Sequence, residues 1–86
     1  VLLEAAPRHI PLDAVRAGLR AVPGVESVHD LHVWSVDSGL VAMSAHAVVP
    51  DLARHDAALR EIDAAVRALG IGHVTLQLER AAIDPC

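Results

Sequence analysis

The sequence has no lysine, one aromatic residue (Trp34) and one cysteine (Cys86) among its 86 residues. The basic residues are therefore all arginines, and because they form no cluster they do not provide the basic patch that nucleic-acid binding needs. A single cysteine excludes an internal disulfide framework and fits a reducing compartment. No apolar run approaches the roughly 20 residues of a membrane-spanning helix, and no signal peptide is visible.

Apolar residues are nevertheless abundant. They make up 53% of the chain, and with one aromatic ring the core must consist of Val, Leu, Ala and Ile. A chain of this length is expected to form one domain, with a core near the lower limit for unaided folding. Such cores are often supplemented by dimerisation or a metal, and the net charge of −4 favours cations. Because the chain begins at Val1, we expect it to be part of a longer protein.

The periodicity of apolar residues predicts two helices and three strands in the order αββαβ. The expected helices cover residues 12–22 and 52–69, the first preceded by Pro11 and followed by Pro23-Gly24. The expected strands cover residues 25–36, 40–49 and 73–79. The prediction is an α+β sandwich in which a three-stranded mixed sheet carries both helices on one face.

Two histidines and a carboxylate fall between His29 and His32, in a strand that aliphatic residues alone could pack. Such side chains change protonation near neutral pH or bind metals, so they indicate a functional site. A two-residue turn at Ser38-Gly39 would oppose His29 to Val48 and place it diagonal to His46 on one face. A three-residue loop would instead bring His32 beside His46.

The two-residue turn divides the hairpin into an apolar face, assigned to the core, and an open face. The apolar face is expected to hold Val28, His32, Trp34, Val36, Val41, Met43, Ala45, Ala47 and Val49. The open face is expected to hold His29, Val33, Ser44 and His46. Trp34 is interpreted as a packing residue, in the core or at a dimer contact.

A third strand parallel to the second would bring Gln77 and Glu79 level with His46. His55, in the first turn of the second helix, could bend toward the same end. Imidazole nitrogens with one carboxylate suit Zn²⁺ or a related divalent ion. The candidate ligands are His29, His46, His55 and Glu79, and the further candidates are Gln77, His32, His73 and Cys86. Each also has a plainer interpretation as an exposed or packing residue.

Three segments, VHDLHVW at 28–34, SAHAVV at 44–49 and HVTLQLE at 73–79, resemble the cytoplasmic C-terminal domain of the cation diffusion facilitator family. LLE at 2–4 and PGV at 23–25 fit the same family. The resemblance covers nearly the whole chain, and its specificity lies in the order and spacing of the segments. It implies a ferredoxin-like, metallochaperone-like αββαβ domain that dimerises below the transmembrane domain of a metal/proton antiporter.

The resemblance also implies ligand roles for His29, His46, His55 and Glu79. Gln77 stands where some members have a histidine, and Cys86 echoes a tail cysteine of others. The expected function of residues 1–86 is that of a cytoplasmic regulatory domain of a zinc-type antiporter in a bacterial inner membrane. Binding of Zn²⁺, or of Cd²⁺, Co²⁺, Ni²⁺ or Fe²⁺, is expected to tighten a homodimer and favour efflux.

Two other interpretations stay open. One is a structural dimerisation module with incidental histidines, and the other is a free-standing metallochaperone, although such domains usually present a CxxC pair that this chain lacks. An enzyme is not expected, because no serine or cysteine nucleophile has a histidine base at a recognisable spacing and no HExxH pair is present.

Overall fold

The structure, a computed structural model, describes residues 10–37 and 39–81. Its elements are α1 (Leu12–Arg20), β1 (Ser27–Asp37), β2 (Leu40–Val48), the short 3-10 helix η1 (Leu52–Arg54), α2 (His55–Ala68) and β3 (His73–Glu79). The predicted order of helices and strands is confirmed, and the bounds predicted for the last strand match those observed.

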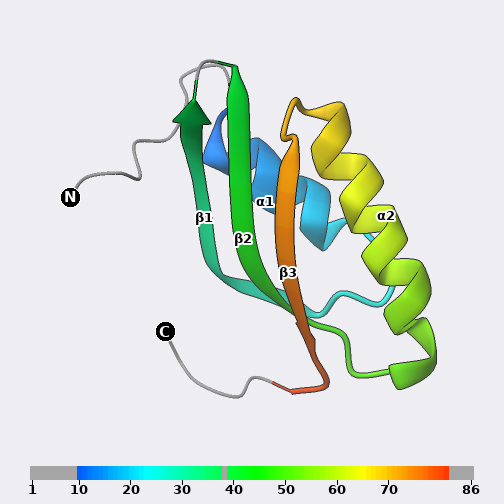
Figure 1. Ribbon diagram of the computed structural model, residues 1–86. Coiled ribbons are helices and arrows are strands. Elements are labelled where there is room, and N and C mark those ends of the chain that lie inside the picture. Colours follow the sequence, from blue (N-terminus) through cyan, green and yellow to red (C-terminus); the bar gives the residue numbers. More distant parts are fainter. Residues whose placement is uncertain (1–9, 38, 82–86) are drawn as a thin grey trace.

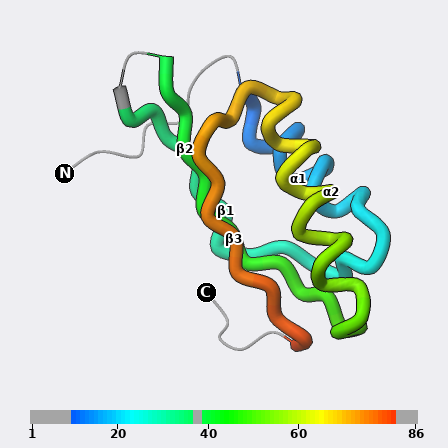
Figure 2. The backbone as a smooth tube through the Cα atoms, turned by 45° about the vertical axis from the view of Figure 1, so that its right-hand side comes forward, coloured from blue at the N-terminus to red at the C-terminus, as the bar shows by residue number. Residues whose placement is uncertain are grey.

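The three strands form one sheet in which β2 lies in the centre. It pairs antiparallel with β1 and parallel with β3 (Figure 1). Both helices lie on the same side of this sheet (Figure 2), so the predicted α+β sandwich is confirmed. Within the described residues, no helix combines the length and the apolar composition needed to cross a membrane.

The core between the helices and the sheet is aliphatic, as the composition predicts. Each helix buries one stripe of residues at intervals of four, which is typical of an amphipathic helix packed on one side. These buried positions are Val15 and Leu19 in α1, and Ala58, Ile62 and Val66 in α2. From the sheet, β2 and the residue after it contribute Val41, Met43, Ala45, Ala47 and Val49. The core-facing side of β2 was therefore predicted correctly.

The segment predicted as one helix over 52–69 divides into η1 and α2. The Asp51 carboxylate accepts a hydrogen bond of 3.0 Å from the backbone N–H of Ala53, which caps a tight first turn. Leu52, at the start of this turn, is 61% exposed. The regular helix consequently begins at His55.

β1 contains one residue more than its partner at two points, and these irregularities change the register. One lies beside Asp37, next to the hairpin turn, and the other lies between His29 and His32. Together they slide the far end of β1 by two residues. His29 therefore lies directly opposite His46, and the prediction that it opposes Val48 is wrong.

The irregularity beside Asp37 inverts the faces of the β1 residues that precede it, back to His32, because side chains alternate along a strand. Val33 is consequently buried in the core, whereas His32 is exposed and Trp34 is half-buried. The prediction that His32, Trp34 and Val36 line the core, with Val33 on the open face, is wrong. The second irregularity inverts the alternation again, so His29 returns to the open face.

Candidate metal centre

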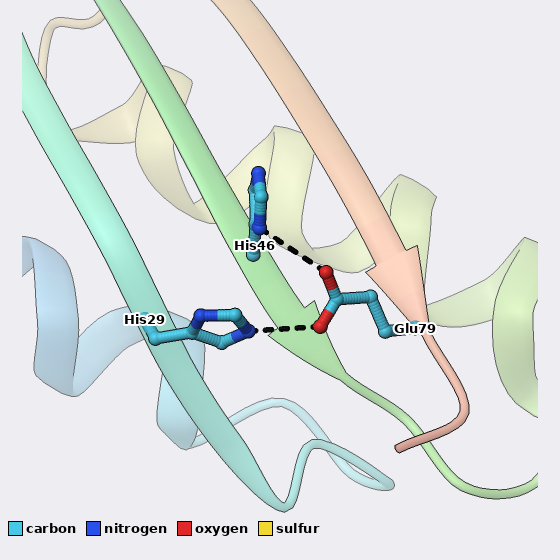
Figure 3. A group of neighbouring side chains, drawn as sticks. All are labelled: His29, His46 and Glu79. Atoms are coloured by element: carbon cyan, nitrogen blue, oxygen red, sulfur yellow. Dashed lines mark hydrogen bonds and ion pairs between the residues drawn. The ribbon is translucent and has the colours of Figure 1, made fainter. Parts of the chain in front are cut away.

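His29, His46 and Glu79 meet on the open face of the sheet, and each comes from a different strand (Figure 3). His29 Nε2 lies 2.8 Å from Glu79 Oε1, and His46 Nδ1 lies 3.1 Å from Glu79 Oε2. The two imidazole rings are edge-on, with centroids 5.1 Å apart and an interplanar angle of 85°. One potential ligand atom from each residue lies within 4.8 Å of the other two.

Strand pairing explains this convergence. The shifted register of β1 sets His29 directly across from His46, and opposed residues share a face. The parallel pairing with β3 sets Gln77 level with His46, and Glu79 is the next residue of β3 on that face. Glu79 therefore ends its strand beside both histidines, with its side chain 1% exposed.

Glu79 is held in its ionised form. The hydrogen bond with His29 lowers the pKa of Glu79 below its usual value of 4.5, although burial acts in the opposite direction. A hydrogen bond of 2.9 Å from Gln77 Nε2 to Glu79 Oε2, and the electrostatic influence of both imidazoles, also lower this pKa. Metal ligands must be deprotonated, so at neutral pH the carboxylate is in the form that binds a cation.

The donor set fits a small divalent cation such as Zn²⁺. Zinc binds imidazole nitrogen and carboxylate oxygen at about 2.0–2.2 Å, so the ligand atoms of a tetrahedral site are roughly 3.3 Å apart. The observed N···O separations of 2.8 and 3.1 Å are close to this spacing, and all three ligand atoms lie within 4.8 Å of one another. Three protein ligands leave a fourth tetrahedral position for water or another group.

Two of the other predicted ligands, His55 and Gln77, make hydrogen bonds of their own. His55 is half-buried, and its Nε2 lies 2.8 Å from the carbonyl oxygen of Val49, which accepts its N–H. Among the described residues, His55 is not part of the group of side chains that could hold a metal ion. Gln77 donates to Glu79 and so lies beside the centre as predicted, oriented with its amide nitrogen toward the carboxylate.

Two further candidates, His32 and His73, are described by the structure and are not part of this group. His32 lies opposite Ser44 rather than beside His46, so the alternative register is also wrong. His73 is exposed at the start of β3, at the opposite end of that strand from Glu79. Cys86 lies outside the described residues.

Asp30 was not among the predicted site residues. Its Oδ2 lies 3.8 Å from His46 Nε2, and its Oδ1 lies 3.4 Å from His32 Nε2. The backbone of Asp30 has a φ of 56°, in the left-handed region that aspartate tolerates better than most residues. The signal in the sequence was a carboxylate directly after His29. With strict alternation of side chains along β1, Asp30 would point toward the core, where a metal ligand is not expected.

These features define an αββαβ domain with two imidazoles and a buried carboxylate on its open sheet face. Residues 7–81 match the family described as the cytoplasmic domain of cation efflux proteins. The chain therefore belongs to this family, and the predicted resemblance to the cation diffusion facilitators is confirmed.

Several known proteins are similar to the chain. It is 41% identical over 85 residues to the cadmium, cobalt and zinc/H(+)-K(+) antiporter of Bacillus velezensis. The aligned region covers 95% of this chain and 27% of that protein. It is 36% identical over 81 residues to metal tolerance protein 1 of Oryza sativa subsp. japonica, covering 93% of this chain and 19% of that protein. The chain thus spans about a quarter or less of the length of these relatives.

Among solved structures, the chain is similar to the metal-bound C-terminal domain of the CzcD transporter from Cuprividus metallidurans. The TM-score is 0.73 and the sequence identity 36%, with 81% of this chain and 99% of that chain covered. This structural similarity supports the predicted fold class, which does not depend on the register between β1 and β2. The family and the relatives are transporters, so the prediction that the chain is not an enzyme is confirmed.

Proposed function

We propose that residues 1–86 are the cytoplasmic C-terminal regulatory domain of a divalent-cation/proton antiporter of a bacterial inner membrane. The domain binds a divalent cation through His29, His46 and Glu79. The observation that carries this proposal is the meeting of two imidazoles from β1 and β2 on a buried carboxylate from β3. The name of the Bacillus relative favours Zn²⁺, Cd²⁺ and Co²⁺ over Ni²⁺ and Fe²⁺.

The three residues divide the work of binding. His29 Nε2 and His46 Nδ1 face the carboxylate, so each can turn a lone pair toward a cation placed between them and Glu79. Glu79 contributes one negative charge from a buried position, where electrostatic attraction is less screened than in water. To bind the cation, each ring must present a nitrogen without a proton, so a proton on His29 Nε2 or His46 Nδ1 must move to the other ring nitrogen or leave.

The proposal extends to a second copy of the chain as partner. The core is small and aliphatic, and the helices leave one face of the sheet uncovered (Figure 2). On that face, Asp30 and Glu79 oppose the approach of another acidic copy, and a bound cation offsets their charge. Occupancy then shifts the population toward the pair, and by way of the transmembrane domain toward efflux. This requires that the pair bind the cation more tightly than separate copies do.

Sedimentation velocity of the chain at micromolar concentrations, with and without Zn²⁺, tests this coupling. Zinc is expected to lower the dissociation constant of the dimer by about tenfold, within the range usual for coupled sites. His46→Ala is expected to abolish the change, and His73→Ala to preserve it. Calorimetric binding of zinc with no change in self-association would remove the regulatory role but keep the metal site. A dimer that zinc neither binds nor alters would indicate a structural module.

A further inference from the structure

We propose that Asp30 is the positioning residue of this metal centre. It holds the Nε2 side of His46, so that the ring presents Nδ1 to the cation beside Glu79. The inference rests on the proposed metal site and assigns the second carboxylate near it a separate task.

The His46 ring lies between two carboxylates. Its Nδ1 is 3.1 Å from Glu79 Oε2, and its Nε2 is 3.8 Å from Asp30 Oδ2. Only one nitrogen of an imidazole can bind a given ion, and a metal-binding histidine usually donates its other N–H to a carboxylate or carbonyl. That second contact fixes both the tautomer and the orientation of the ring. Asp30 is the carboxylate placed for this contact.

The distance of 3.8 Å is longer than a hydrogen bond, so without a cation the attraction between Asp30 and His46 is electrostatic. A movement of less than about 1 Å brings Nε2 within donating distance. Asp30 is held from its other side by His32, whose Nε2 lies 3.4 Å from Oδ1. The carboxylate, whose side chain is 41% exposed, therefore lies between two histidines of the open face.

The backbone of β1 explains why Asp30 reaches this face. His29 points to the open face, so regular alternation would direct Asp30 toward the core. The left-handed conformation of Asp30, with φ of 56°, coincides with the second irregularity of β1. An extra residue at such a bulge re-aims a side chain. The bulge at Asp30 thus completes the register that sets His29 opposite His46, and it turns a carboxylate toward the outer nitrogen of His46.

If Asp30 served only the backbone conformation of β1, a variant that keeps this conformation but lacks the carboxylate would still bind Zn²⁺ normally. Three substitutions separate the two roles. Glycine adopts positive φ at no steric cost, so Asp30→Gly keeps the bulge and removes the carboxylate. Asparagine has nearly the shape of aspartate and also tolerates the left-handed region, so Asp30→Asn removes only the charge. Asp30→Ala removes the carboxylate and also strains the backbone.

The test measures the Zn²⁺ affinity of the 86-residue chain by competition with a chelator. Asp30→Asn and Asp30→Gly are each expected to weaken binding about 10–100-fold, the usual effect of losing an outer partner of a metal-binding histidine. Asp63→Asn is the matched control, because Asp63 is a surface aspartate that pairs with Arg67 on α2. It is expected to leave the affinity unchanged.

Long-range ¹H–¹⁵N correlation spectra of the zinc-loaded chain give a second readout. The unmodified chain is expected to show His46 bound through Nδ1 with a protonated, slowly exchanging Nε2, and Asp30→Asn is expected to lose that protection. Unchanged affinity and unchanged His46 signals in both variants would show that Asp30 serves the backbone alone, and would overturn the inference. A failure of the unmodified chain to bind zinc would overturn the metal site itself, and the inference with it.

Discussion

Replacing His46 by alanine is expected to weaken Zn²⁺ binding by at least about 100-fold, because the loss of a direct ligand should exceed the ~10–100-fold cost of losing an outer partner. This corresponds to about 2.7 kcal/mol of binding free energy. His46 is the central residue of the group, since it lies across from His29 and contacts the Glu79 carboxylate. Competition calorimetry against a chelator of known affinity measures the change.

His73→Ala is the matched control for this substitution. His73 is also a strand histidine, but it is exposed and pairs with Ala42, which places it roughly 13 Å along the sheet from the level of His46. Its removal is expected to leave the affinity unchanged. Equal losses in the two variants would mean that zinc binds to exposed histidines in general, and the site on the open face would then be wrong.

Zinc is also expected to stabilise the folded chain strongly. A free concentration of about 100 times the dissociation constant adds about 2.7 kcal/mol to the free energy of unfolding. For a domain of this size that raises Tm by about 10–20 °C. Glu79→Gln is expected to lose most of this gain, because an amide oxygen carries no charge to offset that of the cation. Thermal unfolding followed by circular dichroism, with and without zinc, provides the measurement.

The comparison must use the zinc-dependent change within each variant, since Glu79→Gln also alters the bonds to His29 and His46. Glu61→Gln is the control, because Glu61 is a half-exposed carboxylate that pairs with Arg54. Its gain on adding zinc should equal that of the unmodified chain, and a chelator should reverse both. A Glu79→Gln variant that gains as much as the others would show that Glu79 is not a ligand.

The elements of the fold were predictable because their apolar patterns are strong. The stripe of Ala58, Ile62 and Val66 requires a helix with one buried side, and alternation over 73–79 requires a strand with one buried face. The break after Leu52–Arg54 was not predictable in the same way. It depends on a hydrogen bond from Ala53 to the Asp51 side chain, which apolar spacing does not encode.

The register of β1 could not be predicted from the turn alone. Residues 28–36 are apolar on both faces, so their pattern does not reveal where an extra residue is inserted. The alternation of side chains between the two faces of β1 changes only at the two irregularities. As a result, Val33 faces the core and Trp34 the open face, the reverse of the prediction. A turn fixes register only as far as the first bulge.

The nearness of His29, His46 and Glu79 was nevertheless predicted, because two one-residue shifts leave the face of His29 unchanged. The placement of His55 was not, since the start of α2 sets its ring against the Val49 carbonyl. Asp30 was missed because its position depends on a left-handed backbone conformation. Periodicity therefore predicted the residues that follow regular strand geometry. The positions of His55 and Asp30 depend on local backbone geometry and could be established only from the structure.

Diffraction from crystals grown with zinc, recorded on both sides of the zinc absorption edge, tests the metal centre most directly. An anomalous peak is expected on the open face, bonded to His29 Nε2, His46 Nδ1 and a Glu79 oxygen at about 2.0–2.2 Å. Zinc bound only at other residues, with His29 and His46 still in contact with the Glu79 carboxylate, would contradict the assignment of the site.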